Sequence, residues 1–568
     1  MKNQWVIKPK PNERLVNQLM EEVWLPQSLA TILAQRGVES FEQAKAFFRP
    51  DLAQLHDPFL MKDMDLAVDR IISAIEKNEK ILVYGDYDVD GTTAVSMVYD
   101  FLNSFYPKIG YYVPDRYTEG YGVSIQGIDH AFENNFSLII ALDCGIKAVE
   151  QVKYARTKNV DFIICDHHLP GENLPEAVAV LDPKRADCAY PFKELSGCGV
   201  GFKLLQALSQ RLEISEDILF DYLDLLVVSI AADIVPIVDE NRVLGHFGLR
   251  KLLESPRLGL SSLLGESKRT NLTIANIVFQ IAPKINASGR LEHASQSVDL
   301  LISKDEKEVA LFAEAIATLN DVRKETDSDV TQQAIALIQE SQEEQAFSTV
   351  IYHPDWHKGV LGIVASRLIE TYYRPTLVLT DGNEGEISGS ARSIKDFDLY
   401  EIIDQCSDLL TRYGGHKFAA GLTMKKENLP EFKARFEELV QQKIKPIQRK
   451  PSIEIDVELD FSEIDDKFLR ILKQMEPFGP QNMTPLFLTR NLKGGNLRLM
   501  GKNEEHISLT LMDANNVQFH AVGFGMGKHF DEFKFSQNFD VVYSIEENHW
   551  KDKVHLQFIL RDVRFKDF

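Results

Sequence analysis

The sequence has no long apolar run, no excess of basic residues and no paired cysteine motif. Its best apolar segment, Leu223–Ala232, is short and contains Asp224, so the sequence predicts no transmembrane helix. The N-terminal residues lack the apolar stretch of a signal peptide. The five cysteines, an odd number, show no metal-binding spacing, which favours reduced thiols in a cytoplasmic protein.

The charge balance is acidic. A net charge of −22 argues against a protein that coats nucleic acid nonspecifically. It does not exclude a nuclease, because a channel for a strand needs only a local basic lining. Composition alone favours a small-molecule enzyme over a DNA enzyme. With 568 residues, of which 44% are hydrophobic, the chain should form roughly three or four globular domains.

Acidic and histidine-containing motifs follow the ends of several predicted strands. Four of them can supply about five or six oxygen and imidazole ligands without thiolates, a set that suits Mg²⁺ or Mn²⁺ better than zinc. Two such ions side by side are a common device for hydrolysing phosphate esters. The sequence therefore predicts a metal-dependent phosphoesterase. The four motifs, and a fifth further along, are Gly85–Gly91, Leu142–Gly145, Asp166–His168, Ala232–Asp233 and Gly414–His416.

Single motifs allow other interpretations. Asp86, Asp88 and Asp90 are spaced as in a calcium loop, but the glutamate expected later in such a loop is missing. Carboxylates also occur at helix N-termini because the helix dipole favours them. Asp143, after an apolar strand, would be a costly lone charge unless it caps a helix or binds a cation. Adjacent histidines beside a carboxylate at a strand end favour metal ligation.

Strands and helices alternate in the first half of the chain. The alternation predicts an α/β fold with a mainly parallel sheet, whose ligand crevice lies at the carboxyl ends of the strands. Asp88, Asp90, Asp143 and His167 lie just past predicted strands, and Asp233 ends an apolar helix, so one crevice can collect them. The predicted strands are Lys80–Gly85, Ile109–Val113, Ser137–Leu142, Val160–Cys165 and Ala177–Leu181, and the helices are Thr92–Phe105, Ile125–Asn134 and Ala148–Lys158.

Five parts are expected along the chain. They are an N-terminal helical cap (1–50), a catalytic α/β domain (51–297), a linker helix (298–345), a second α/β accessory lobe (346–445) and a β-barrel of the oligonucleotide-binding (OB) type (452–568). Five or six short strands over roughly a hundred residues predict the barrel. Its aromatic residues Phe487, Phe519, Phe524 and Trp550 are candidates for stacking on bases, although such residues more often belong to a core.

The order of these motifs, with Ala-Ala-Asp-Ile-Val-Pro at 231–236 and Gly-Gly-His-Lys-Phe-Ala-Ala-Gly at 414–421, resembles the DHH phosphoesterase superfamily. More closely, it resembles the RecJ family of single-strand DNA exonucleases. The likeness covers about residues 55–565 and implies a parallel-sheet DHH domain, an accessory lobe joined by a long helix, and a C-terminal barrel. It includes Pro114–Arg116, Gly197–Gly201, Ala282–Arg290, His357–Val360, Ser388–Arg392 and Pro477–Asn482.

The resemblance also implies roles for individual residues. The implied metal ligands are Asp88, Asp90, Asp143, His167 and Asp233, with Asp143 bridging two ions. Residues that support them or the chemistry are Asp86, Asp166 and His168. In the accessory lobe, His416 is implied to bind phosphate, helped by His357. The positions that match a pocket for the 5′-terminal phosphate are Arg116, Arg290, Ser390 and Arg392.

The function that the resemblance implies is 5′→3′ exonuclease activity on single-stranded DNA. Two Mn²⁺ or Mg²⁺ ions would hydrolyse the phosphodiester and release 5′-mononucleotides, in DNA repair and recombination. The implied partners are single-stranded DNA and, among proteins, single-strand binding protein or a recombination helicase, with no membrane and a monomeric chain. One rival is a DHH phosphodiesterase for oligonucleotides or small phosphorylated substrates, which would need neither barrel nor linker helix. Another is a non-catalytic DNA-binding relative, which would lack metal carboxylates.

Overall fold

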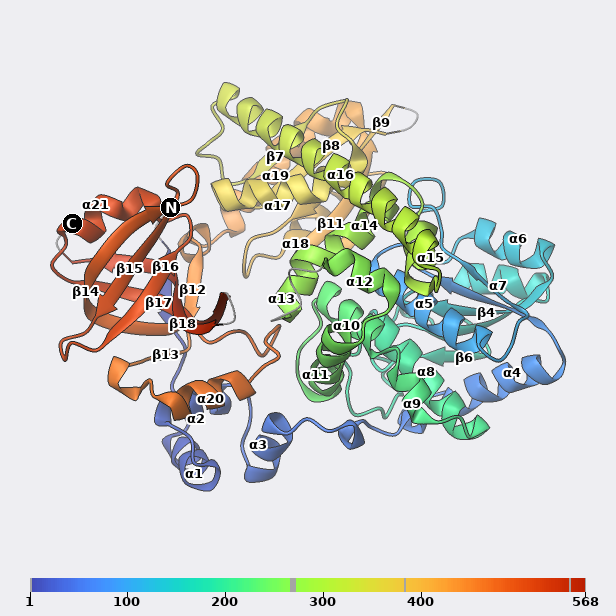
Figure 1. Cartoon of the computed structure of the whole chain (residues 1–568). Coiled ribbons are helices and arrows are strands. Elements are labelled where there is room, and N and C mark those ends of the chain that lie inside the picture. Colours follow the sequence, from blue (N-terminus) through green and yellow to red (C-terminus); the bar gives the residue numbers. More distant parts are fainter. Residues whose placement is uncertain (1–2, 266–271, 383–384, 551–552, 567–568) are drawn as a thin grey trace. The chain divides into compact units, whose positions relative to one another are not determined.

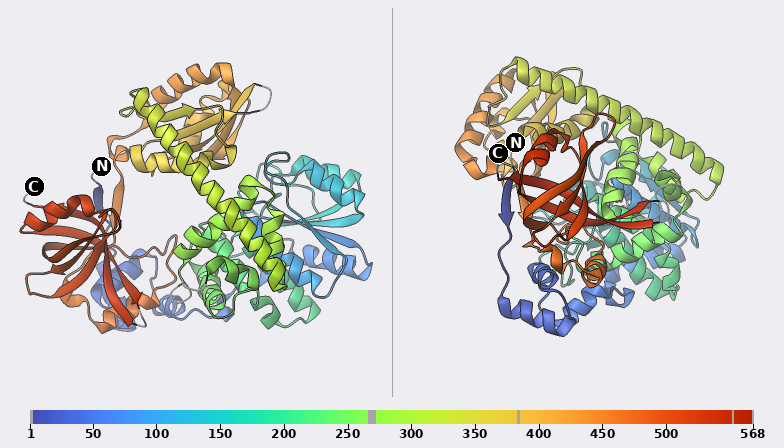
Figure 2. Two further views of the ribbon diagram at one scale, coloured as in Figure 1. Left: turned by 45° about the horizontal axis from the view of Figure 1, so that its top comes forward. Right: turned by 60° about the vertical axis from the view of Figure 1, so that its left-hand side comes forward.

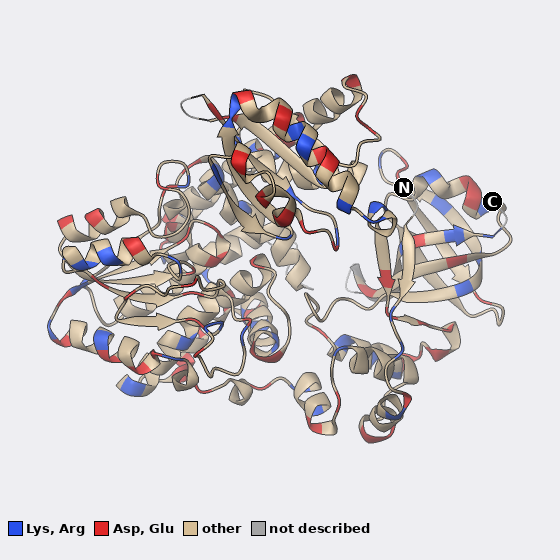
Figure 3. Ribbon diagram, turned by 180° about the vertical axis from the view of Figure 1, so that it is seen from behind, with Lys and Arg blue, Asp and Glu red and all other residues tan. Residues whose placement is uncertain are grey.

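The computed structural model describes residues 3–265, 272–382, 385–550 and 553–566 (Figure 1). The chain forms two units, one of residues 1–6 and 317–453, the other of residues 7–316 and 454–568. Basic and acidic residues are interspersed along the elements of both units (Figure 3). In the part of the chain that is described, no helix combines the length and the apolar character needed to cross a membrane.

A five-stranded parallel sheet carries the predicted metal ligands. Its order is β3-β2-β4-β5-β6, and it confirms the predicted α/β fold with a parallel sheet. Alternate residues of β4 enter different cores: Leu138 and Ile140 pack on one face, and Ile139 and Ala141 on the other. This two-sided burial explains why the strands are continuously apolar. The elements are β2 (Lys80–Gly85), β3 (Ile109–Tyr112), β4 (Phe136–Leu142), β5 (Asp161–Cys165) and β6 (Ala179–Leu181), with α4 (Met64–Glu76), α5 (Val89–Asn103), α6 (Ile125–Glu133) and α7 (Val149–Thr157).

A helical layer follows the sheet along the chain. Its central helix, α10 (Leu223–Ala232), is buried over almost its whole length and contacts α5, α8 and α11. The apolar run of α10 is thus core rather than membrane span. The other members are α8 (Gly197–Leu212), α9 (Glu216–Phe220), α11 (Asp239–Glu254), α12 (Leu258–Leu264), α13 (Ile274–Asn276), the π-helical turn Ile277–Ile281, α14 (Ala282–Leu291) and α15 (Ser295–Ile302).

The expected linker helix of residues 298–345 is wrong in one respect, because the chain breaks between α15 and α16 (Glu306–Glu340). The carboxylate of Asp305 accepts hydrogen bonds from the backbone N–H groups of Lys307 and Glu308, at 2.8 and 3.1 Å. Asp305 therefore caps a new helix of 35 residues. The apolar stripe continues across the three-residue break, which is why periodicity alone missed it.

The accessory lobe contains a second five-stranded sheet, in the order β10-β11-β9-β8-β7. β7 and β8 run parallel, whereas β8, β9, β11 and β10 pair antiparallel in turn. Helix α17 packs on β8 and β9. The elements are β7 (Thr349–Tyr352), α17 (Leu361–Tyr372), β8 (Thr376–Asp381), β9 (Glu386–Arg392), α18 (Leu399–Asp404), β10 (Arg412–His416), β11 (Ala419–Lys425) and α19 (Leu429–Lys443).

The C-terminal strands form a closed barrel, as predicted, because β14 also pairs with β17 (Figure 2). Among the stacking candidates, Phe487 is fully buried, Phe519 is half-buried against Phe558, and Phe524 is 60% exposed. The side chain of Trp550 lies outside the described residues. The barrel consists of β14 (Phe487–Met500), β15 (His506–Met512), β16 (Gln518–Gly523), β17 (Phe539–Trp550) and β18 (Lys553–Phe565), with α20 (Asp466–Gln474) and α21 (Phe530–Phe535).

The N-terminal segment differs from the expected helical cap. It opens with a strand, β1 (Gln4–Ile7), which pairs with β12 (Ser452–Ile455), so β12 does not join the barrel, whereas β13 (Val457–Glu458) pairs with β14. Leu29 and Ile32 are buried in the barrel's own hydrophobic core. Long-range pairing of this kind leaves no local periodicity to read. The helices are α1 (Glu13–Val23), α2 (Gln27–Gln35) and α3 (Phe41–Phe48).

The motif Pro477–Asn482 forms a structural junction around Arg242 of α11, which is 4% exposed. The guanidinium donates hydrogen bonds to the carbonyls of Phe47, at 3.0 and 2.9 Å, and of Met475, at 3.0 Å. Its Cζ lies 3.8 Å from the centroid of the Phe47 ring. Burial, then the charge of Arg36, lowers the pKa of Arg242 to about 9. Peptide dipoles and a ring thus stabilise a buried cation and tie α11 to two distant segments.

Candidate active site

The loop after β2 carries three aspartates into the crevice. Asp88 caps α5, since its carboxylate accepts from the N–H of Gly91 at 3.0 Å. Asp90 is 2% exposed and accepts from the N–H groups of Gly197 and Cys198, at 2.6 and 2.8 Å, at the start of α8. The hydroxyl of Ser229 donates to the same carboxylate at 2.6 Å. A helix N-terminus and a hydroxyl therefore hold Asp90 in one orientation.

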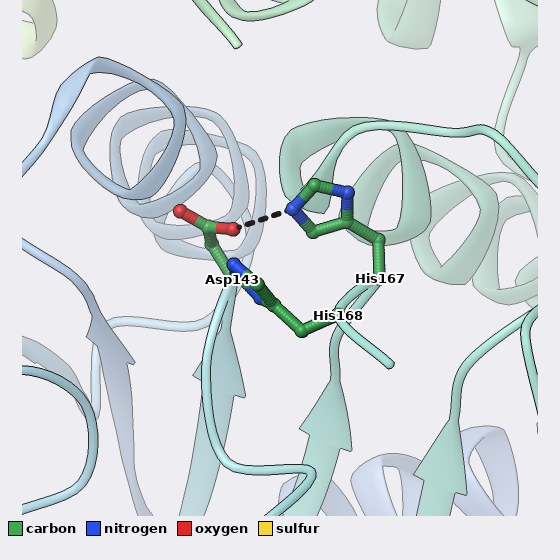
Figure 4. Close-up of side chains that lie close together, drawn as sticks. All are labelled: Asp143, His167 and His168. Atoms are coloured by element: carbon green, nitrogen blue, oxygen red, sulfur yellow. Dashed lines mark ion pairs between the residues drawn. The ribbon is translucent and has the colours of Figure 1, made fainter. Parts of the chain in front are cut away.

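His167, after β5, faces three carboxylates (Figure 4 shows it with Asp143 and His168). Its Nε2 lies 3.1 Å from Oδ1 of Asp143, 3.8 Å from Oδ2 of Asp90 and 3.7 Å from Oδ2 of Asp233. Two groups of side chains have ligand atoms within 4.8 Å of one another, Asp143 with His167 and His168, and Asp90 with His167 and Asp233. Residues from four separate parts of the chain thus meet at the sheet edge, as the strand-end pattern predicted.

The donor atoms fit a hard divalent cation. Among the described residues, Oδ1 of Asp143 and both ring nitrogens of His167 are buried without a hydrogen-bond partner. Orphaned buried polar atoms are costly, and a cation between them removes that cost. Carboxylates with imidazole, and no cysteine in either group, suit Mn²⁺ or Mg²⁺. Asp143 also has φ of 58°, a strained backbone conformation of the kind that clusters at functional sites.

Burial and mutual repulsion raise the pKa values of several carboxylates in the cluster. Burial, then the charges of Asp90, Asp88 and Asp233, raises the pKa of Asp143 well above its ordinary value. Burial, then Asp90 and Asp88, does the same for the pKa of Asp233. For Asp86, burial and then the charge of Asp88 raise the pKa. The cluster is therefore costly as a set of bare anions, which is the physical condition for tight cation binding.

Asp166 orients the two histidines that follow it. Its Oδ1 accepts from Nδ1 of His168 at 2.8 Å and from the backbone N–H of His167 at 2.7 Å. Its Oδ2 accepts from the N–H of Ile146 at 2.9 Å. Burial opposes ionisation of Asp166, but these hydrogen bonds and the charge of His168 outweigh it and lower its pKa to about 2. The carboxylate thus stays ionised and fixes the ring of His168.

Arg116 and Arg290 approach each other through Tyr87, the residue between Asp86 and Asp88. The Cζ of Arg116 lies 4.9 Å from the centroid of the Tyr87 ring. The charges of both arginines act on Tyr87, although burial dominates and raises its pKa to about 12. The hydroxyl of Tyr117, next to Arg116, donates to the carbonyl of Arg290. Two of the four predicted phosphate-binding residues therefore lie beside the aspartate loop.

The other predicted residues belong to the accessory lobe. Nη1 of Arg392 donates to Oγ of Ser390 at 2.9 Å on β9. His416 ends β10, and its Nδ1 accepts from the N–H of Phe418 at 3.3 Å. Nδ1 of His357 accepts from the N–H of Gly359 at 3.1 Å. An Nδ1 that accepts a hydrogen bond leaves the proton of a neutral imidazole on Nε2. These four residues belong to the unit of residues 1–6 and 317–453, and the candidate metal ligands belong to the other unit.

Two residues that contact the predicted site residues were not predicted from the sequence. The hydroxyl of Tyr121 lies 3.1 Å from Nε2 of His168, and the side chain is 58% exposed. Gly362, at the start of α17, allows close packing, because a Cβ there would lie 2.6 Å from Nη2 of Arg392 and 3.0 Å from Oγ of Ser390. The sequence signals were a tyrosine-rich stretch after Arg116 and a glycine two residues after the motif His357–Val360. Neither signal is specific without the fold.

Comparison with known proteins agrees with this geometry. The family model described as "DHH family, N-terminal domain" matches residues 80–230, "DHHA1 domain" matches 342–442, and "RecJ OB domain" matches 455–562. The chain is 36% identical to the single-stranded-DNA-specific exonuclease RecJ of Bacillus subtilis, over 100% of this chain and 71% of the relative. It is 31% identical to the protein of that name in Escherichia coli, over 82% and 83%.

Solved structures are similar over long stretches. The crystal structure of RecJ from Thermus thermophilus in complex with Mn²⁺ matches with a TM-score of 0.83 at 26% identity, covering 100% of this chain and 80% of that one. A structure of exonuclease RecJ bound to manganese matches with a TM-score of 0.60 at 31% identity, covering 70% and 98%.

The parallel sheet with its acidic edge and the two DHH-type matches define a phosphoesterase of the DHH class. Such an enzyme can carry different accessory modules, and here the third matched module is the barrel. The chain belongs to the RecJ family. It is therefore an enzyme, a metal-dependent nuclease.

Proposed function

We propose that the chain is a single-stranded-DNA-specific exonuclease that digests from the 5′ end and releases 5′-mononucleotides. The observation that carries the proposal is the position of His167, whose Nε2 faces three buried carboxylates at 3.1–3.8 Å. The names of the relatives support the substrate, since they are single-stranded-DNA-specific exonucleases. Repair and recombination are the settings in which we expect the reaction to serve.

We propose two ions, held by Asp88, Asp90, Asp143, His167 and Asp233, with Asp143 shared between them. Two divalent cations, when bound, would activate the attacking water and neutralise charge on the phosphate and the leaving 3′ oxygen. Asp90 is held by the amides of α8, and Asp166 fixes His168. These residues need no rearrangement as charge develops, which is how a preorganised site lowers a barrier.

We attribute the direction of digestion to the arginine groups. Guanidinium forks bind phosphate with charge-assisted hydrogen bonds, and a hydroxyl can add a further donor. Arg116 and Arg290 beside the aspartate loop, and Ser390 with Arg392 in the accessory lobe, would hold the 5′-terminal phosphate. His416 and His357 would donate from Nε2 to a neighbouring phosphate. The barrel would bind the strand further along.

We expect the enzyme to act in the cytoplasm as a monomer, with single-strand binding protein or a recombination helicase as protein partners. The five cysteines are buried and unpaired, which accords with a reducing compartment.

The decisive experiment is digestion of single strands labelled at the 5′ or the 3′ end, with Mn²⁺ or Mg²⁺. We expect labelled mononucleotide to appear first from the 5′ label, and duplex to resist. Early release of the 3′ label would overturn the direction. Digestion confined to short oligonucleotides or cyclic dinucleotides would favour a small-substrate phosphodiesterase instead.

A further inference from the structure

An exposed aromatic ring, that of Phe418, lies close to His416, one of the residues that we propose to bind phosphate in the accessory lobe. Phe418 sits in the short loop between β10 and β11, and its side chain is 50% exposed. It belongs to none of the hydrophobic clusters found among the described residues, including the core of its own lobe. Single exposed apolar residues are common on protein surfaces, so the exposure of Phe418 gains meaning only from the groups around it.

The loop that carries Phe418 is held rigidly. The N–H of Ser393 donates to the carbonyl of Phe418 at 2.9 Å, and the N–H of Leu399 donates to the carbonyl of Lys417 at 3.0 Å. The N–H of Phe418 itself donates to Nδ1 of His416. The loop backbone is therefore tied to neighbouring segments at two consecutive residues, Lys417 and Phe418, so less backbone freedom is lost when a ligand binds there.

The surroundings of the ring are cationic or hydrogen-bond donating. Arg392 is the partner of Ala419 in the β9–β11 register, one residue from Phe418. The ring centroids of His416 and Phe418 are 6.5 Å apart, and Nζ of Lys417 lies 5.4 Å from the Phe418 centroid. A flat apolar surface thus adjoins groups suited to a phosphate. A nucleotide has the matching pair of features, because its base lies one sugar away from its phosphate.

We propose that Phe418 stacks on the base of the nucleotide whose phosphate is held by Arg392 and His416. The inference rests on the proposed function and extends it from the strand backbone to a base. Stacking tolerates every base, since each has a π-face, so a nuclease that must digest any sequence can use it. Phe418 would thereby place the phosphodiester for cleavage without reading sequence.

The test measures binding of the full-length chain, made inactive by Asp143→Ala so that the strand stays intact. Anisotropy of a labelled 5′-phosphorylated strand is compared with that of strands carrying one abasic residue at successive positions from the 5′ end. Phe418→Ala should weaken binding to the intact strand by about 5- to 100-fold, the range for loss of one base–aromatic stack. For the parent, the Asp143→Ala chain with Phe418 intact, one abasic position should lower the affinity by a similar factor. The chain that also carries Phe418→Ala should bind that abasic strand as tightly as the parent does, because the stack is already lost.

Matched variants separate stacking from other effects. Phe418→Trp should keep the affinity and Phe418→Leu should lose it, since leucine is apolar but cannot stack. Phe132→Ala, which removes a ring with 47% exposure from α6, should change nothing. Unchanged thermal unfolding of Phe418→Ala is expected because the ring is outside the core.

The outcomes for the inference and for the function are distinct. Equal binding by parent and Phe418→Ala, or equal losses for Phe418→Ala on every abasic strand, would overturn the stacking role and leave the exonuclease in place. A parent that binds no single strand would overturn the proposed function, and the stacking role with it.

Discussion

Gly197 is packed against Asp143 so closely that a Cβ on Gly197 would lie 2.5 Å from the Cβ of Asp143 and 2.7 Å from its Cα. Two real side chains do not approach in this way, so residue 197 has to be glycine for Asp143 to occupy its place. The glycine also donates its N–H to Asp90 at 2.6 Å. The Gly-rich start of α8 thus positions two of the carboxylates that we propose as metal ligands, Asp90 and Asp143.

Gly197→Ala should therefore displace Asp143 or the start of α8 and reduce nuclease activity by about 100-fold, the cost of misplacing a reacting group by roughly 1 Å. The control is Gly245→Ala in α11, where the nearest atom to a new Cβ is 3.8 Å away. Turnover of a 5′-labelled strand is the measurement. Similar activities for the two variants would show that Asp143 can shift without harm.

Asp143→Ala should abolish cleavage and leave the chain folded. Loss of a residue that merely supports a metal ligand costs about 10- to 100-fold, so loss of a shared ligand should cost more. Activity in Mn²⁺ and circular dichroism are the two measurements, with the exposed Asp217→Ala as control. Activity near that of the parent in Mn²⁺ would remove Asp143 from the metal site.

Metal addition should raise the melting temperature, and more so at high pH. The pKa values of Asp143, Asp86 and Asp233 are raised in the folded chain, so folding binds protons there and stability falls as pH rises above about 3.9, the unfolded value. Mn²⁺ replaces those protons, and at a hundred times its Kd it would contribute about 2.7 kcal/mol per site. Differential scanning fluorimetry at about pH 5.5 and about pH 8 should show the larger shift at the higher pH. A shift that is equal at both pH values, or absent, would argue against Asp143 and Asp233 as ligands.

Arg392→Ala should discriminate between strand ends. Removing a charge-assisted hydrogen bond costs about 1.5–3 kcal/mol, a factor of about 10 to 150, and the loss should fall on 5′-phosphorylated strands more than on 5′-hydroxyl strands. Arg412→Ala, an 82% exposed arginine of the same lobe, is the matched control. Equal losses on both strands would assign Arg392 to general backbone contacts.

Phe524→Ala should weaken binding to long single strands by about 5-fold or more, with a smaller effect on digestion of short ones. This substitution is preferable to deleting residues from 452 onward, because deletion would expose Leu29 and Ile32. Phe535→Ala, with 65% exposure on α21, is the control. Undiminished affinity of Phe524→Ala in a binding titration would exclude that ring as a stacking surface.

Local sequence patterns predicted the strands of the catalytic sheet and the polar residues that follow them. The strands of the catalytic sheet agree with the predicted ranges to within two residues, because apolar runs buried on both faces end abruptly at the polar residues of the crevice. The same reasoning predicted that Asp88, Asp90, Asp143 and His167 share one edge, since the carboxyl ends of parallel strands meet there. Asp90, Asp143 and His167 do meet, with Asp233 from a helix end, whereas Asp88 is in neither group of close ligand atoms among the described residues.

Contacts between distant segments could not be read in this way. No feature of the β1 residues indicates that β12 is the strand with which it pairs. The start of α16 depends on hydrogen bonds to one side chain, Asp305, and the apolar stripe runs past it without a break. The closeness of Gly362 to Arg392 likewise depends on how α17 packs on β9. The roles of Arg116, Arg290, Ser390 and Arg392 remain predictions, of which Arg392→Ala tests the last.

The burial of Leu29 and Ile32 in the barrel core has a consequence for biosynthesis. Helices α1 to α3 leave the ribosome long before the strands that they complete. During this interval the two apolar side chains lack the barrel residues that they pack against, and the catalytic domain between them can fold first. The barrel core can therefore be completed only after β14 to β18 have been translated, and a chain that stops before β14 would leave Leu29 and Ile32 exposed beside a folded catalytic sheet.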